Sequence, residues 1–203
     1  MNIEITRTTE SFGDAYSISI NSFLLYSACL ETRHFFDNAL VLSRLDHGKH
    51  PRLLLSRNLS FFTASYDLLH WNETMHAWEE HYAQFKTRSL WKSHYQCLHQ
   101  QDVYDIYTHP NQLRSVYKNE QMIACWERAA LAPTDTDCYK ITADDDCEVE
   151  LLISFCLILD NFSSSNKQGL VQLELGLQAE ARPFDPAWKP KYAPLDHLWT
   201  SSL

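Results

Sequence analysis

Apolar residues fall at every second position in two stretches near the C-terminus. The first stretch covers residues 149–159 and the second covers residues 171–181. A segment rich in Ser and Asn, residues 161–169, separates them and ends at a glycine. Strict alternation predicts strands with one buried face, and the turn-forming residues between them predict an antiparallel hairpin over residues 148–181.

The same alternation occurs at the N-terminus, where it predicts a second hairpin. Ile3 and Ile5 alternate with polar residues before the Phe12-Gly13-Asp14 segment, and residues 16–20 alternate after it. A short strand is predicted at residues 138–142.

The central part of the sequence has a different spacing of apolar residues. In residues 21–45 they recur at intervals of three and four, and Pro51 is placed as the first-turn residue of a second helix. Residues 52–109 are rich in Trp, His and Tyr, and predict two or three further helices. A last helix is predicted from Asn111 to about residue 131. The fold class predicted is therefore α+β: an antiparallel sheet formed by the N-terminal and C-terminal hairpins, covered by a layer of about five helices.

The C-terminal segment differs from the rest in its proline content. Four prolines alternate with aromatic residues between positions 183 and 199. Proline at this density excludes a helix or a central strand. We therefore predict one α+β domain over residues 1–181 and an extended arm over residues 182–203. The arm either packs on its own domain or docks on a partner, with a homodimer through the arm as one alternative.

Negative charge is concentrated in the region of the C-terminal hairpin. The chain carries a net charge of −9, and residues 133–181 hold ten acidic and two basic residues, a balance of −8. Such a surface attracts a basic protein and repels nucleic acid. We expect partner contacts at the following acidic and aromatic residues: Asp144, Asp145, Asp146, Glu148, Glu150, Trp188 and Tyr192.

Composition narrows the function further. The four glycines are dispersed, so no phosphate-binding loop is expected, and no cofactor is predicted. The sequence has no long apolar run and no secretory pattern at its N-terminus, and its six cysteines are scattered. We expect a cytoplasmic protein that does not contact membranes. The function predicted is a non-enzymatic interaction protein, an acidic inhibitor or immunity-type protein that occludes a basic partner.

Two E-x-x-H motifs provide the first alternative. They are Glu31-Thr-Arg-His34 and Glu73-Thr-Met-His76. On helices, Glu and His three residues apart project to one side, and this arrangement resembles that of ferritin-like di-iron proteins. The resemblance implies a metal-dependent enzyme that uses Glu31, His34, Glu73 and His76.

A second alternative comes from the pair Arg88 and His94. An Arg followed by a polar residue, with a His a few positions later, resembles the motif of the all-helical HEPN ribonucleases. The resemblance implies RNA cleavage that depends on His94.

Overall fold

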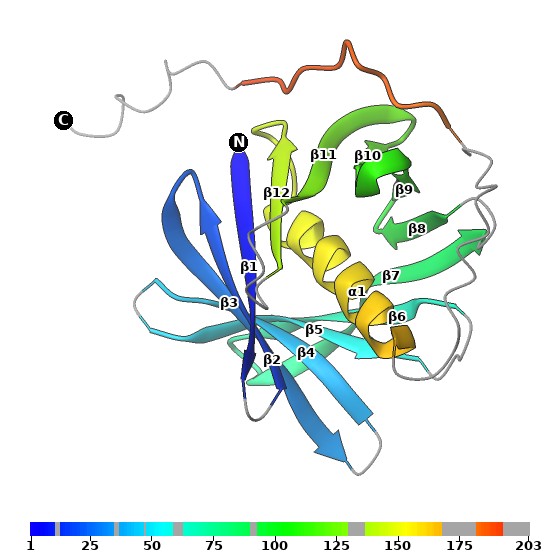
Figure 1. Ribbon diagram of the computed structural model, residues 1–203. Coiled ribbons are helices and arrows are strands. Elements are labelled where there is room, and N and C mark those ends of the chain that lie inside the picture. The colour runs from blue at the N-terminus through cyan, green and yellow to red at the C-terminus, as the bar shows by residue number, and fades with distance from the viewer. Residues whose placement is uncertain are drawn as a thin grey trace.

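The chain forms a closed antiparallel β-barrel of twelve strands that encloses a helix (Figure 1). The structure is a computed structural model that describes residues 1–10, 13–34, 37–46, 48–58, 63–89, 93–129, 137–167 and 182–192. The elements are β1 (Asn2–Glu10), β2 (Gly13–Ile20), β3 (Phe23–His34), β4 (Asp37–Arg44), β5 (His50–Arg57), β6 (Ser65–Asn72), β7 (Ala77–Ser89), β8 (His94–His99), β9 (Asp102–Thr108), the short 3-10 helix η1 (Pro110–Gln112), β10 (Arg114–Lys118), β11 (Gln121–Ala129), β12 (Cys138–Ala143) and α1 (Val149–Lys167).

Each strand pairs with its neighbours in sequence, and β1 pairs with β12 to close the barrel. Tight turns join the strands at the end where Met1 lies. Both residues of the Asn21–Ser22 turn and both residues of the Asn119–Glu120 turn have positive φ, between 47° and 73°. Two such residues in succession form the turn type whose twist matches paired strands. We call this end of the barrel, with its turns and residues 144–148, the mouth.

Helix α1 begins at the mouth and runs through the barrel. Residues 151–160 are all 5% exposed or less. The Phe155 ring lies 5.9 Å from the ring of Phe85 on β7 and 5.7 Å from that of Tyr104 on β9. At the far end, the Asp160 carboxylate pairs with Arg7 on β1 at 3.2 Å. Because strands from opposite parts of the sequence contact the helix, it forms the centre of the core (Figure 1).

The prediction of a strand over residues 149–159 is wrong, because this segment is helix α1. A helix surrounded on every side needs apolar residues on every face, so its sequence shows no helical period. Leu152 and Ile158 occupy positions between the alternating residues, and they are buried as well. The second predicted strand, residues 171–181, lies outside the described residues.

The prediction of about five helices is also wrong, and with it the α+β fold class. Residues 23–34, 37–44 and 50–57 form β3, β4 and β5, and the segments further along that were predicted as helices contain β6 to β11. In β5, Leu53 and Leu55 face the interior, whereas Leu54 packs outside with Val41 of β4. Because both faces of the wall are apolar there, the sequence of β5 does not alternate between apolar and polar residues. Its three consecutive leucines are also compatible with a helix. The N-terminal hairpin and the strand at residues 138–142 are confirmed.

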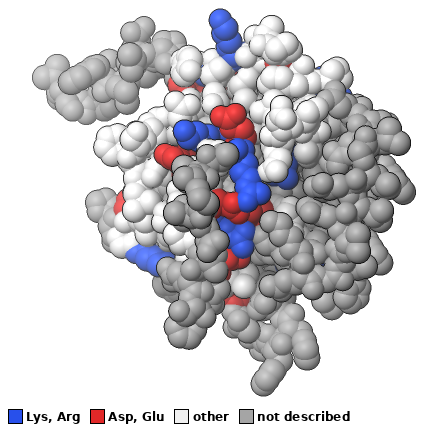
Figure 2. Space-filling model, in the orientation of Figure 1, with Lys and Arg blue, Asp and Glu red and all other residues white. Residues whose placement is uncertain are grey.

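The surface carries charges of both signs. On the face shown in Figure 2, acidic and basic side chains alternate in a band across the middle of the molecule. No helix in the described part of the chain is long and apolar enough to cross a membrane.

Candidate functional site

The mouth of the barrel contains a polar pocket of about 270 Å³ beside the start of α1. Three parts of the chain form it: the ends of β9, β10 and β11, residues 144–148, and the C-terminal arm. The lining residues are Tyr104, Lys118, Asn119, Gln121, Ile123, Asp144, Asp146, Cys147, Glu148 and Lys191.

The β10–β11 turn is held on β9 by hydrogen bonds of Asn119. The Val103 N–H donates to the Asn119 side-chain oxygen at 2.9 Å, and the Asn119 N–H donates to the Val103 carbonyl at 2.9 Å. Next to the turn, the Lys118 ammonium pairs with Asp102 at 2.8 Å. This side of the pocket is therefore rigid, and its cation is already paired.

The arm forms the opposite side of the pocket. Lys191 N–H donates to the buried Asp144 carboxylate at 2.7 Å, and its carbonyl accepts from the Asp145 N–H at 3.0 Å. The indole N–H of Trp188 donates to the Met122 carbonyl at 3.0 Å. Residues 182–192 thus pack on their own barrel as an extended segment.

Two carboxylates in this pocket have no partner within the described part of the chain. Asp146 and Glu148 are exposed, and neither carboxylate makes a hydrogen bond or ion pair with any residue that the structure describes. The Tyr104 side chain is 1% exposed, and its hydroxyl makes no hydrogen bond of normal length among the described residues. The Lys118 ammonium lies near this hydroxyl and opposes the rise in the pKa of Tyr104 that burial causes. A buried polar atom without a partner is uncommon in folded proteins and favours a ligand or an ordered water at that position.

Burial and the neighbouring acids keep two groups near the pocket neutral. Burial, together with the charges of Asp144 and Asp146, raises the pKa of the Cys147 thiol to about 12. Burial, together with Glu148 and Glu150, raises the pKa of Tyr82 to about 12. Both groups stay neutral at physiological pH, and the acids around them favour a cation over an anion.

His99 lies at the mouth end of β8, where its ring contacts Tyr82 and the charge of Glu148 acts on it. It lies on β8 opposite Asp102 of β9, is 5% exposed, and its Nε2 atom has no hydrogen-bond partner within the described residues. Burial lowers the pKa of His99, which favours the neutral ring. A neutral imidazole can accept a hydrogen bond at one of its nitrogen atoms.

The structure brings together most of the predicted acidic residues. Asp144, Asp145, Asp146 and Glu148 all lie at the mouth, although Asp144 is buried and Asp145 pairs with the N-terminal ammonium at 2.6 Å. Glu150 turns into the barrel instead. It pairs with Arg52 of β5 at 2.9 Å and accepts a hydrogen bond from Tyr26 at 3.4 Å.

The two predicted aromatic contacts also lie near the mouth. Trp188 is half-buried against the barrel, and Tyr192, next to Lys191, is 68% exposed. Whether these residues contact a partner stays a prediction.

The two E-x-x-H motifs do not lie on helices. Glu31 and His34 belong to β3, and Glu73 and His76 form the exposed turn between β6 and β7. Glu31 lies in one row with Asp67 of β6, because the residues directly opposite each other on β3, β4, β5 and β6 connect the two. Glu73 follows the end of β6, six residues and therefore about 20 Å from Asp67. The structure therefore separates the two glutamates. The His34 side chain lies outside the described residues, and among those described no cluster of His, Cys, Asp or Glu could hold a metal ion.

The Arg88–His94 pair lies on two strands rather than on helices. Arg88 is near the end of β7, and His94 begins β8, where its Nε2 atom lies 2.7 Å from the Asp105 carboxylate. The barrel differs from the all-helical fold that the HEPN resemblance implies.

Sequence reasoning missed the strand residues that complete the pocket. Tyr104, Lys118 and Gln121 precede the acidic segment by more than twenty positions, and they reach it only because β9, β10 and β11 are adjacent in the wall.

Comparison with known proteins adds no family: no protein-family model, no curated protein and no solved structure matches the chain.

Proposed function

We propose that the protein is a non-enzymatic interaction protein that binds a basic side chain of a partner protein in the mouth pocket. The observation that carries the proposal is that Asp146 and Glu148 line this pocket beside the buried Tyr104, and that neither carboxylate has a partner among the residues that the structure describes. In this role the protein would act as an acidic inhibitor that occludes the basic surface of its partner.

The available hydrogen-bonding groups favour a cationic donor. The carboxylates of Asp146 and Glu148 only accept hydrogen bonds, and the Tyr104 hydroxyl can also accept. An ammonium or guanidinium group supplies several donors and a positive charge at once. The pocket disfavours an anion, because its three carboxylates (Asp144, Asp146 and Glu148) outnumber its two ammonium groups (Lys118 and Lys191).

The size of the pocket favours a side chain over a larger ligand. Its volume of about 270 Å³ lies below the usual range for sites that bury a whole small molecule. A lysine or arginine side chain on a protein surface fits this space, and the rest of the partner would rest on the rim. The remaining charge then steers the encounter.

We also propose a cytoplasmic location. All six cysteines are free, and Cys97, Cys138 and Cys156 are buried. Free buried cysteines are usual in a reducing compartment.

Binding of short oligolysine peptides tests the proposal. Calorimetric titration at low ionic strength should show saturable binding that weakens with added salt, because the contacts are partly exposed ion pairs. The double substitution Asp146→Asn with Glu148→Gln should weaken binding about tenfold.

The control carries the same change in charge at the other end of the barrel. Glu31→Gln with Asp67→Asn also removes two negative charges. The two residues lie in one row across β3, β4, β5 and β6. Oligolysine acetylated on its side chains should not bind. Equal loss of affinity in both double variants would refute the mouth pocket as the binding site.

A further inference from the structure

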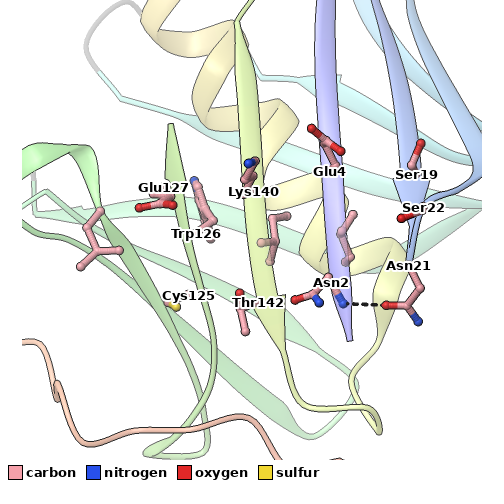
Figure 3. Close-up of a pocket in the computed structure, with 13 residues that line it drawn as sticks. Asn2, Glu4, Ser19, Asn21, Ser22, Cys125, Trp126, Glu127, Lys140 and Thr142 are labelled. Carbon is pink, nitrogen blue, oxygen red and sulfur yellow. Dashed lines mark hydrogen bonds between the residues drawn. The ribbon is translucent and has the colours of Figure 1, made fainter. Parts of the chain in front are cut away.

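A second concave surface lies on the outer wall of the barrel. It is a groove of about 410 Å³ over the neighbouring strands β2, β1, β12 and β11. The Asn21–Ser22 turn borders it on one side and Leu113 on the other. The polar side chains of Glu4, Ser19, Glu127 and Lys140 lie on these strands (Figure 3), and the core residues Ile3, Trp126 and Ile141 also line the groove.

One row of directly opposed residues crosses the floor. Ser19 of β2 lies opposite Glu4 of β1, Glu4 opposite Lys140 of β12, and Lys140 opposite Glu127 of β11. Among the described residues, none of the three charged side chains forms an ion pair, although they are neighbours (Figure 3). The Glu4 carboxylate accepts one hydrogen bond, from the Cys138 thiol at 3.4 Å. The groove therefore presents two acidic groups and one basic group that have no ion pair among the described residues.

Leu24 extends this row at the edge of the groove. It lies opposite Ser19 and is 56% exposed, whereas Phe23 lies opposite Ile20 and is 72% exposed. Because successive strand residues point to opposite faces, Leu24 faces the groove and Phe23 faces the mouth. These two residues connect the groove with the mouth across the rim.

The turn that presents them is fixed to β1. Asn2 N–H donates to the Asn21 side-chain oxygen at 3.0 Å, and Asn21 N–H donates to the Asn2 carbonyl at 2.8 Å (Figure 3). A rigid turn loses little conformational freedom on binding, so exposed apolar side chains on it are suited to anchor a partner.

We propose that the groove binds an extended basic segment of the partner, with Leu24 and Phe23 as apolar anchors. The proposal rests on the proposed function, since the partner is the basic protein that enters the mouth pocket. Glu4 and Glu127 complement two basic residues of this segment, and Lys140 between them favours an acidic or polar residue. The partner then spans the rim and contacts both concave surfaces.

Two short peptides test the groove: one of alternating lysine and leucine, and one of alternating lysine and serine. The unmodified protein should bind the leucine peptide more tightly. The double substitution Phe23→Ser with Leu24→Ser should weaken the leucine peptide about tenfold and leave the serine peptide nearly unchanged. Leu98→Ser is the matched control, because Leu98 is also an exposed apolar residue, 38% exposed, on the distant strand β8.

Amide chemical shifts of the unmodified protein give an independent reading that needs no variant. The leucine peptide should perturb Glu4, Leu24 and Thr142, which lie in or beside the groove. If Asp146→Asn with Glu148→Gln weakens both peptides while Phe23→Ser with Leu24→Ser changes neither, the mouth pocket stands and the groove proposal fails. If the protein alone self-associates through Phe23 and Leu24, the groove's occupant is a second copy and the proposal is overturned.

Discussion

The Tyr16 hydroxyl donates a hydrogen bond to the Asp160 carboxylate at 2.7 Å, and this contact fastens the barrel wall to the helix inside it. Asp160 is 5% exposed and also accepts hydrogen bonds from Tyr139 and Arg7. Burial, together with the Asp160 charge, raises the pKa of Tyr16, so Tyr16 stays a protonated donor. At the mouth, the pair of Glu150 with Arg52 holds the other end of the helix. The two attachments fix the position of α1 along the barrel.

Removing the Asp160 carboxylate should destabilise the fold strongly. Asp160→Ala leaves the buried hydroxyls of Tyr16 and Tyr139 without their acceptor, whereas Arg7 keeps its ion pairs with Asp14 and Asp137. We expect a loss of about 2–6 kcal/mol in the free energy of unfolding, from about 1–3 kcal/mol for each unsatisfied hydroxyl. Urea denaturation followed by circular dichroism measures the change. Asp67→Ala, on the outer wall, should change it by less than about 0.5 kcal/mol. A loss at Asp160 as small as the control would contradict the attachment.

Phe155 tests the packing between the helix and the wall. Phe155→Ala removes a ring that contacts Phe85 on β7 and Tyr104 on β9. We expect a loss of about 3–5 kcal/mol, because the enclosing barrel cannot collapse into the cavity. The same denaturation experiment on Met75→Ala, at a turn residue that is 63% exposed, should show almost no change. Equal stabilities for the two variants would place the helix outside the barrel.

Local pattern was sufficient only for β1, β2 and β12, whereas β3 to β11 were predicted as helices although they also pair with their neighbours in sequence. The hairpin of β1 and β2 and the strand β12 follow from alternation of apolar and polar residues. Closure of the barrel depends on the pairing of Ile3 with Ile141, which no local pattern encodes. Helix α1 was predicted as a strand because a helix that the barrel wall surrounds is apolar on every face and therefore shows no helical period.

The mouth pocket was predictable only in part. The acidic segment at Asp144, Asp145 and Asp146 stands out by its charge and does lie at the mouth. Tyr104 looks in sequence like any other aromatic residue of an alternating strand, and its place beside Glu148 depends on the order of strands in the closed wall.

The arm should open when its indole anchor is removed. Lys191 is the only trypsin site within residues 182–192 that is not followed by proline, and hydrogen bonds to Asp144 and Asp145 hold its backbone. Trp188→Ala removes the bond to Met122, so cleavage after Lys191 should become faster under native conditions. Mass spectrometry of timed digests measures the rate. Ala187→Gly, which keeps the indole, serves as the control, and an unchanged rate in Trp188→Ala would show that the indole does not hold the arm.

Cys97 should make stability depend on pH in the alkaline range. Its side chain is 0% exposed on β8, and burial raises the pKa of its thiol from 9.0 to about 12. Above about pH 9 the unfolded chain loses this proton while the folded chain keeps it. The unfolded state is then favoured, and the contribution of Cys97 to stability falls by about 1.4 kcal/mol for each pH unit until the folded thiol also ionises near pH 12. Below about pH 9 both states carry the proton, and the contribution is constant.

Cys97→Ala should therefore lower stability at pH 7 through lost packing. Its curve of stability against pH should nevertheless be flatter than that of the unmodified protein between pH 9 and 11, by about 1.4 kcal/mol for each pH unit. Urea denaturation of both proteins across this range makes the comparison, and parallel curves would mean that the Cys97 thiol ionises equally in the folded and unfolded states.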